Sequence, residues 1–187
     1  MASRFSIAFV LCVLPLGAQG KSKAKAPAAA PAPIPEPTPK ANWNGTWALV
    51  AGESESLEAR VAEFTKDMNF VQKQLWKRKL AKACKGFGKF LILGGDVFSI
   101  SLDKELPLNT AMDGTAGNWT HSDGTKYETS GARKGDTIVQ TLQGDGYTLS
   151  YTYFMRKDGQ TLVMQAAYTS PKLPDSFLVK QVFRKND

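Results

Sequence analysis

Histidine and cysteine are almost absent from this chain, which has 187 residues but only one histidine and two cysteines. A zinc site of the usual Cys/His type therefore cannot be built within one chain, and neither can a cluster of histidine acid/base groups. Most acidic residues lie in turn sequences or on a charged helical segment, and no pair of carboxylates stands out. We accordingly expect no metal, no cofactor and no enzymatic activity. His121 lies beside Asp123-Gly124, so we expect it on the surface at a turn.

The N-terminal 20 residues predict export. Arg4 precedes an apolar run from Ile7 to Leu16, and Ala18-Gln19-Gly20 supplies small residues before Lys21. This is the layout of a secretory signal peptide cleaved after Gly20. The apolar run is well short of the roughly 20 residues that a membrane-spanning helix needs. We expect the mature protein in the periplasm or outside the cell.

Cleavage would remove Cys12 and leave Cys84 as the single thiol, so no intramolecular disulfide can form. We interpret Cys84 as a small apolar residue on a helix face. Residues 21–40 are rich in lysine, alanine and proline, with little apolar surface to bury, and predict an extended, flexible linker. Its lysines suit loose contact with an anionic membrane or wall polymer; the alternative is that they serve solubility alone.

Residues 41–187 are long enough for one compact domain with a full core. A short aromatic and β-branched run from Trp43 to Val50 predicts a strand. Glu53 to Lys85 then contains no glycine or proline, and its apolar residues recur at helical spacing. This predicts one long helix, or two helices with a break near Asp67 to Asn69. The apolar stripe consists of Leu57, Val61, Phe64, Met68, Val71 and Leu75.

From Phe90 onward the pattern is that of strands joined by tight turns. Asp-Gly pairs recur at residues 113–114, 123–124, 145–146 and 158–159, with Gly135-Asp136 among them. Such pairs supply the positive φ angles of hairpins, so consecutive antiparallel strands are predicted. One strand, a helical segment and eight or nine further strands predict a mainly β fold: an antiparallel up-and-down barrel of about nine or ten strands.

The clearest strand alternates Tyr147, Leu149, Tyr151, Tyr153 and Met155 on one face with small polar residues and Phe154 on the other. An antiparallel sheet with one face on the core shows this alternation. By alternation alone, we predict a ligand pocket lined by nine residues: Phe98, Ile100, Tyr147, Leu149, Tyr151, Tyr153, Leu162, Met164 and Tyr168.

Gly45-Thr46-Trp47, the helical insert after that strand and a last strand ending Val182-Phe183-Arg184 together resemble the calycin superfamily. The insert is more like the fatty-acid-binding proteins, where a helical lid covers the barrel, than like classical lipocalins. The resemblance implies that Trp47 closes the barrel base under a basic residue, here Arg184, and that Gly45 belongs to the same motif. The carboxylate-binding arginine and tyrosine of the fatty-acid-binding proteins would fall at Gln181 and Phe183. Their replacement argues against a buried fatty-acid head-group site.

The resulting hypothesis is a non-enzymatic exported barrel that binds a small hydrophobic, lipid-like ligand. The alternative is a protein-interaction or envelope module with a packed interior, docking through segments such as Lys172-Leu173-Pro174. Export and the lack of a recognised motif argue against nucleic-acid binding, despite the basic residues between Lys73 and Lys89. The same segment suits contact with an anionic membrane surface or an envelope protein. The lid or membrane-contact residues predicted are Phe64, Met68, Val71, Leu75, Trp76, Lys77 and Arg78.

Overall fold

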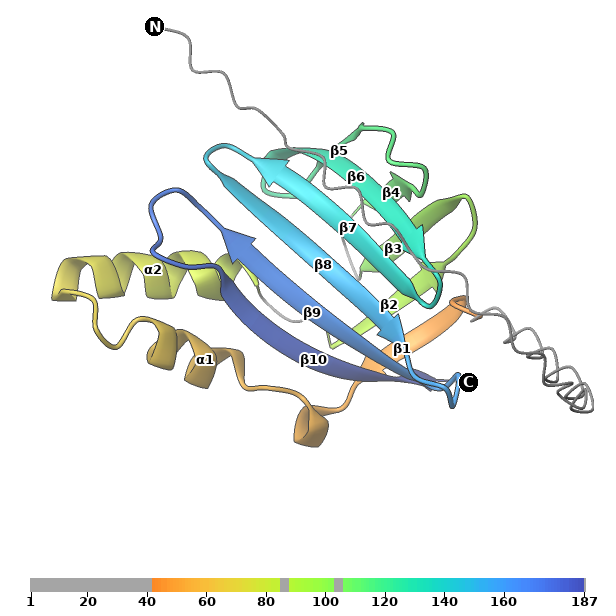
Figure 1. The fold of residues 1–187 in the computed structure, drawn as a ribbon, viewed down its shortest axis with the longest axis horizontal. Helices are drawn as coiled ribbons and strands as arrows, with labels where there is room; N and C mark the ends of the chain where they lie inside the picture. Colours follow the sequence, from red (N-terminus) through yellow and green to blue (C-terminus); the bar gives the residue numbers. More distant parts are fainter. Residues whose placement is uncertain (1–41, 85–87, 103–105, 187) are drawn as a thin grey trace, which may run out of the picture. The chain divides into compact units, whose positions relative to one another are not determined.

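The computed structural model describes residues 42–84, 88–102 and 106–186. The predicted signal peptide and linker, residues 1–40, lie outside the described residues, as does Cys12. The fold is mainly β, with ten antiparallel strands in a nearly closed barrel and two helices between the first and second strands (Figure 1). The elements are β1 (Gly45–Leu49), the 3-10 helix η1 (Ala51–Glu53), α1 (Leu57–Phe64), α2 (Phe70–Ala83), β2 (Lys89–Leu93), β3 (Val97–Leu102), β4 (Leu108–Ala111), β5 (Gly117–Thr120), β6 (Lys126–Lys134), β7 (Thr137–Gly144), β8 (Tyr147–Met155), β9 (Thr161–Thr169) and β10 (Phe177–Asn186).

The strands follow the chain as a meander, and the first strand closes the sheet onto the last. The hydrogen-bonded order is β4-β3-β2-β1-β10-β9-β8-β7-β6-β5. All four predicted Asp-Gly glycines and Gly135 have positive φ angles, between 59° and 87°. The meander prediction is therefore confirmed, and its cause is the local turn chemistry.

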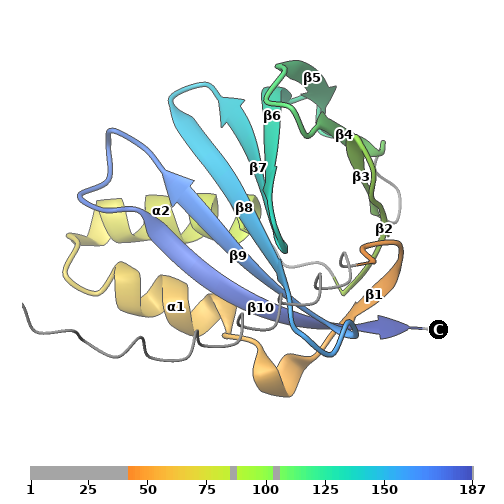
Figure 2. The same cartoon turned by 45° about the vertical axis from the view of Figure 1, so that its right-hand side comes forward.

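The barrel is closed on one side by packing rather than by a full ladder. β4 and β5 are the two ends of the sheet, and they curl toward each other in Figure 2. β4 packs against β6, and an isolated bridge joins Asp113, two residues after β4, to Ala132 in β6. Gly131 in β6 permits this approach, since a Cβ there would lie 2.7 Å from Thr110 Cγ2 and 2.9 Å from the Ala111 carbonyl oxygen.

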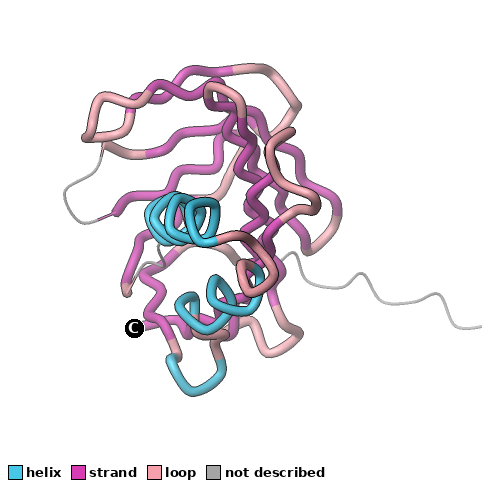
Figure 3. Tube along the Cα trace, turned by 90° about the vertical axis from the view of Figure 1, so that its left-hand side faces the viewer, coloured by secondary structure: helices cyan, strands magenta, loops and turns pink. Residues whose placement is uncertain are grey.

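Two helices form between β1 and β2, as one of the two predicted arrangements. The Ser56 hydroxyl accepts from the Ala59 N–H at the start of α1, and the Asn69 side chain accepts from the Gln72 N–H at the start of α2. Each side chain thus caps its helix. Figure 3 shows both helices nearly end-on in front of the strands. Edge-to-face ring contacts hold the helices against the strands: Phe64 of α1 packs on Phe177 of β10, and Trp76 of α2 packs on Tyr168 of β9.

The predicted apolar stripe is wrong in its second half. Val71 and Leu75 are 75% and 48% exposed, while Trp76 and Leu80 form the buried face of α2. The break at residues 65–69 restarts the helix in a new rotational phase, so the spacing counted from Leu57 does not continue into α2. In the described part of the chain no helix is both long and apolar enough to cross a membrane.

The predicted pairing of Trp47 with Arg184 is also wrong. Trp47 is fully buried, but the ammonium above its ring belongs to Lys185, 5.8 Å from the ring centroid. Lys185 is the direct partner of Trp47 in the β1–β10 register. Arg184 points to the other face and pairs with Glu53 at 3.0 Å, and Arg156 reaches the same carboxylate at 3.4 Å. Strand alternation explains the exchange, because neighbouring residues face opposite sides.

Candidate functional site

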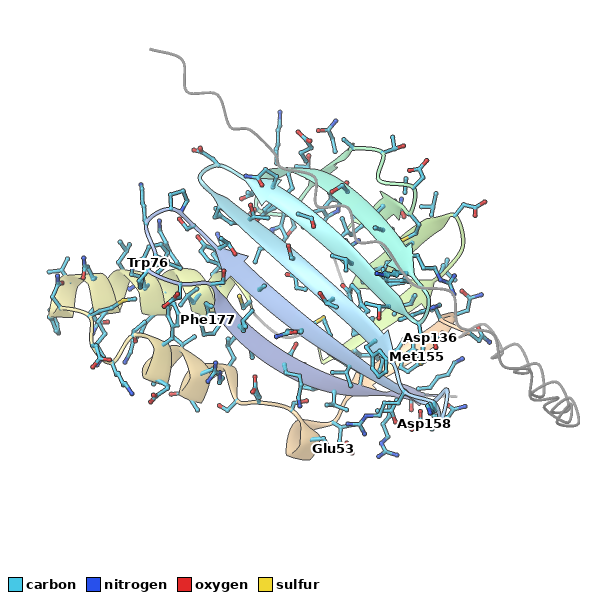
Figure 4. The ribbon with its side chains drawn as sticks, in the orientation of Figure 1. Glu53, Trp76, Asp136, Met155, Asp158 and Phe177 are labelled. Atoms are coloured by element: carbon cyan, nitrogen blue, oxygen red, sulfur yellow. The ribbon has the colours of Figure 1, made fainter. Side chains whose placement is uncertain are left out.

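The barrel interior is lined by the residues that alternation selected. Eight of the nine predicted pocket residues are buried and Tyr147 is half-buried. Inward positions on β8, β9 and β10 share rows through their register, for example Tyr153, Met164 and Gln181. Figure 4 shows Trp76 and Phe177 at the helix end of the barrel and Met155 at the opposite end. Whether these residues contact a ligand stays a prediction.

Aromatic contacts bridge the two walls of the barrel. Phe98 on β3 lies 5.3 Å from Tyr153 on β8, between ring centroids, although five places in the sheet order separate these strands. Trp43 packs edge-on against Phe98 at 6.1 Å. Side chains from the two walls therefore meet across the interior at this level.

A short chain of uncharged polar groups crosses the interior next to the aromatic bridge. Gln140 donates from Nε2 to Thr110 Oγ1 at 2.6 Å, and the Tyr153 hydroxyl donates to Gln140 Oε1 at 3.3 Å. Burial raises the pKa of Tyr153 well above its ordinary value, because the charged phenolate would be desolvated. The phenol therefore remains neutral and keeps the proton that it donates to Gln140.

Two buried acceptors in the barrel lack a hydrogen-bond partner among the described residues: Gln181 Oε1 and Thr129 Oγ1. Gln181 is 5% exposed and shares the inward parity of Phe177, Val179 and Phe183 on β10. An unpaired buried acceptor costs roughly 1–3 kcal/mol of desolvation, so a donor brought by a ligand or solvent would be stabilising. None of the side chains buried in the described ranges is charged.

Sequence reasoning missed the buried polar residues Thr110, Thr129 and Gln140, because polar side chains are normally placed on the solvent face. A usable signal exists at Gln140, which lies midway between Ile138 and Leu142 on β7. Both neighbours of the same parity are apolar and buried, so alternation alone directs Gln140 inward.

Of the remaining predicted site residues, some pack against the barrel and others are exposed to solvent. Phe64 and Met68 pack partly against the core, and Trp76 is buried against the barrel. Lys77 is half-buried and Arg78 is exposed, as are Val71 and Leu75. Leu173 is buried, which leaves Lys172 and Pro174 as the exposed part of the predicted docking loop.

His121 and Cys84 occupy unlike surroundings. His121 is half-buried and packs edge-on against Trp119, and its Nδ1 lies 3.0 Å from Asp123 Oδ1.

Cys84 is 3% exposed at the C-terminus of α2, and burial raises the pKa of its thiol to about 12. A thiol so protonated and covered is a poor nucleophile, which fits the interpretation of Cys84 as a packing residue. Across residues 42–84, 88–102 and 106–186, no three His, Cys, Asp or Glu side chains gather as metal ligands.

Comparison with solved structures identifies the fold. The chain is similar to a protein described as the REP1-NXSQ fatty acid transporter, with a TM-score of 0.50 and 16% identity over 77% of this chain and 96% of that one. It is also similar to human cRBP IV (TM-score 0.49, 16% identity, 78% and 99% covered). A third similar structure is a Schistosoma mansoni fatty acid binding protein in complex with arachidonic acid (0.49, 13%, 78% and 96%).

No protein-family model matches the chain, and no curated protein sequence does either. At these identities the structural likeness shows the fold alone. The fold is a nearly closed ten-stranded barrel similar to that of the fatty acid transporter, with the helix pair placed between the first two strands as the sequence resemblance implied.

Proposed function

We propose that the protein is a non-enzymatic, exported carrier that binds a small, uncharged hydrophobic ligand inside the barrel, beneath α1 and α2. The observation that carries this proposal is the unpartnered Gln181 Oε1, buried in an interior that is otherwise largely apolar. A ligand with an apolar body and one hydroxyl or amide N–H would cover both kinds of surface. The similar fold of a fatty acid transporter supports the apolar ligand class.

A carboxylate head group fits this interior poorly. A buried carboxylate needs a cation or several donors to replace its hydration, and none of the buried side chains in the described segments is charged. The position that the fatty-acid-binding resemblance reserves for arginine is occupied by Gln181, and Phe183 replaces the tyrosine. We therefore propose a neutral alcohol or amide head group.

Native mass spectrometry tests the proposal directly. The full chain is expressed with its N-terminal segment, purified from its export compartment and analysed before and after solvent extraction. We expect a mature mass that begins at Lys21 and a stoichiometric, extractable, uncharged adduct. Protein that carries no adduct and stays bare when it is incubated with hexadecan-1-ol or with 2-acetylnaphthalene would contradict the carrier and favour the packed interaction module.

Gln181→Leu is expected to change stability and affinity in opposite directions. Removing the unpaired acceptor should raise the free energy of unfolding of the ligand-free protein by about 1 kcal/mol. Loss of the hydrogen bond to the ligand should weaken hexadecan-1-ol binding roughly tenfold. Chemical denaturation and calorimetric titration measure the two effects.

Gln165→Leu is the matched control, because Gln165 is exposed on the outer face of β9 beside Lys180. It should leave the affinity for hexadecan-1-ol unchanged. Equal affinities of wild type and Gln181→Leu would exclude Gln181 from the binding site.

We also propose that the first turns of α2 contact an anionic membrane surface. Phe70 and Val71 are 76% and 75% exposed, in a helix that also carries Lys73, Lys77 and Arg78. The α2 end that joins α1 is the end furthest from the barrel in Figure 1. Apolar side chains at a helix tip with cations beside them suit the boundary between headgroups and acyl chains.

Replacing both Phe70 and Val71 with serine is expected to weaken binding to phosphatidylglycerol vesicles roughly tenfold or more, since two apolar side chains leave the bilayer. Vesicle co-sedimentation measures the change. Phe154→Ser is the control, because Phe154 is an exposed aromatic on the outer face of β8. If the double variant sediments like wild type, α2 is not the contact.

A further inference from the structure

Five aromatic side chains form a continuous series of ring contacts at the helix end of the barrel, which we call the aromatic arc. It begins at Trp76 on α2 and passes to Tyr168, 6.2 Å away between ring centroids. Tyr168 stacks on Tyr147 at 5.1 Å with the rings 13° from parallel. Tyr127 follows at 6.1 Å and stacks in turn on Trp119 at 5.7 Å.

The five residues of the aromatic arc come from five different helices and strands, and the register of the strands sets the order of the rings. Trp119 and Tyr127 are direct partners of the β5–β6 pair, while Tyr147 is the first residue of β8 and Tyr168 lies near the end of β9. An ion pair of 2.8 Å between Lys82 on α2 and Asp123 in the β5–β6 turn brings α2 back to the far end of the arc. The helix therefore meets the arc at both of its ends.

The arc runs from the buried interior toward solvent. Trp76 and Tyr168 are 5% and 4% exposed, whereas Tyr147, Tyr127 and Trp119 are half-buried. Partly exposed aromatic faces next to a buried apolar interior are the surface that an amphiphilic ring would contact on its way inward. Trp119 is fixed by its Nε1–H, which donates to the Leu106 carbonyl oxygen at 3.1 Å.

A hydrogen-bond donor lies within the arc. The hydroxyl oxygens of Tyr127 and Tyr147 are 2.7 Å apart, and either can donate to the other. Two hydroxyls that share one hydrogen bond keep one proton to donate elsewhere. Burial is the main cause that raises the pKa of Tyr127, so the Tyr127 hydroxyl stays neutral at physiological pH.

We propose that the aromatic arc recognises a planar aromatic group bearing an oxygen acceptor, so that the ligand is an aromatic amphiphile rather than a saturated acyl chain. This inference rests on the proposed carrier function and names its ligand class. Aromatic rings add stacking and edge contacts to the arc beyond the apolar area that they bury, and a saturated ring of the same skeleton cannot.

Three small probes separate the two contributions: 2-acetylnaphthalene, its saturated analogue 2-acetyldecalin, and 2-ethylnaphthalene, which lacks the oxygen. Calorimetric titration of the full chain should show 2-acetylnaphthalene binding roughly tenfold more tightly than 2-acetyldecalin. Trp119→Leu should reduce that preference to about twofold or less. Replacing both Tyr127 and Tyr147 with phenylalanine keeps the rings and removes both hydroxyls. This double variant should lose the preference for 2-acetylnaphthalene over 2-ethylnaphthalene and keep the preference for 2-acetylnaphthalene over 2-acetyldecalin.

Phe154→Leu is the control for the loss of an aromatic ring outside the arc, and thermal denaturation establishes that each variant is folded. Equal affinity for 2-acetylnaphthalene and 2-acetyldecalin overturns the inference. Binding of hexadecan-1-ol without 2-acetylnaphthalene also overturns it and leaves the carrier function standing. Binding of none of the four compounds refutes the carrier function together with this inference.

Discussion

Replacing Phe98 with alanine is expected to lower the free energy of unfolding by about 3–5 kcal/mol, which is among the largest effects of a single substitution in this domain. Phe98 is fully buried and contacts both Tyr153 across the barrel and Trp43. Truncation leaves a cavity that rigid opposite walls cannot close, so the cost includes both lost transfer free energy and lost contacts. Denaturant titration measures it.

The cavity left by Phe98→Ala should also bind small apolar molecules, because a dry cavity lined by apolar side chains takes them up. Benzene should therefore raise the denaturation midpoint of Phe98→Ala but not that of the wild type. Phe98→Leu is the milder control and should cost less, since most of the volume is kept. An Ala variant as stable as wild type would show that Phe98 and Tyr153 do not support the two walls.

Gly131→Val is expected to destabilise the protein by about 2–3 kcal/mol through overpacking. The new side chain would meet Thr110, Met112 and the Ala111 carbonyl oxygen, all in or next to β4. Because β4 approaches β6 closely at Gly131, the substitution should push the two strands apart. Amide hydrogen exchange should then increase first in β4 and β5.

Gly52→Ala is the matched control for Gly131→Val. Nothing lies within 4 Å of a Cβ built at Gly52, so the change should stay within about 0.5 kcal/mol of wild type. Equal stability of Gly131→Val and Gly52→Ala would mean that β4 can move away from β6 without loss.

The sequence predicts best those turns and strands whose conformation is set by residues close by in the chain. The turns at Gly114, Gly124, Gly146 and Gly159 depend on neighbouring residues alone, and β8 was predicted at its observed bounds from alternation. The buried face of α2 was not, because the rotational phase of a helix after a break depends on what the helix packs against. Trp76 and Leu80 find the barrel, whereas Val71 and Leu75 keep the spacing of α1 but face solvent.

Contacts across the barrel were the least accessible to sequence reasoning. Phe98 and Tyr153 were both selected as inward residues, but nothing in either strand indicates that the two rings meet. That Lys185 rather than Arg184 lies over Trp47 could have been predicted from the sequence. Strand alternation from Phe177 places every second residue, including Lys185, on the inner face with Trp47. The orphaned oxygen of Gln181 needs the three-dimensional structure, because it depends on every neighbour at once.

The pairing of β1 with β10 also has a consequence for folding kinetics. The strand that holds Trp47 finds this neighbour only after the ribosome has added Lys185, so β1 has to wait for β10 before the two can pair. The hairpins from β6 to β10 have low contact order and can form early, whereas joining β1 to β10 closes the longest loop in the domain. Newly made chains therefore pass through a state in which the edge of β10 is exposed, and chaperones that mask strand edges would raise the yield.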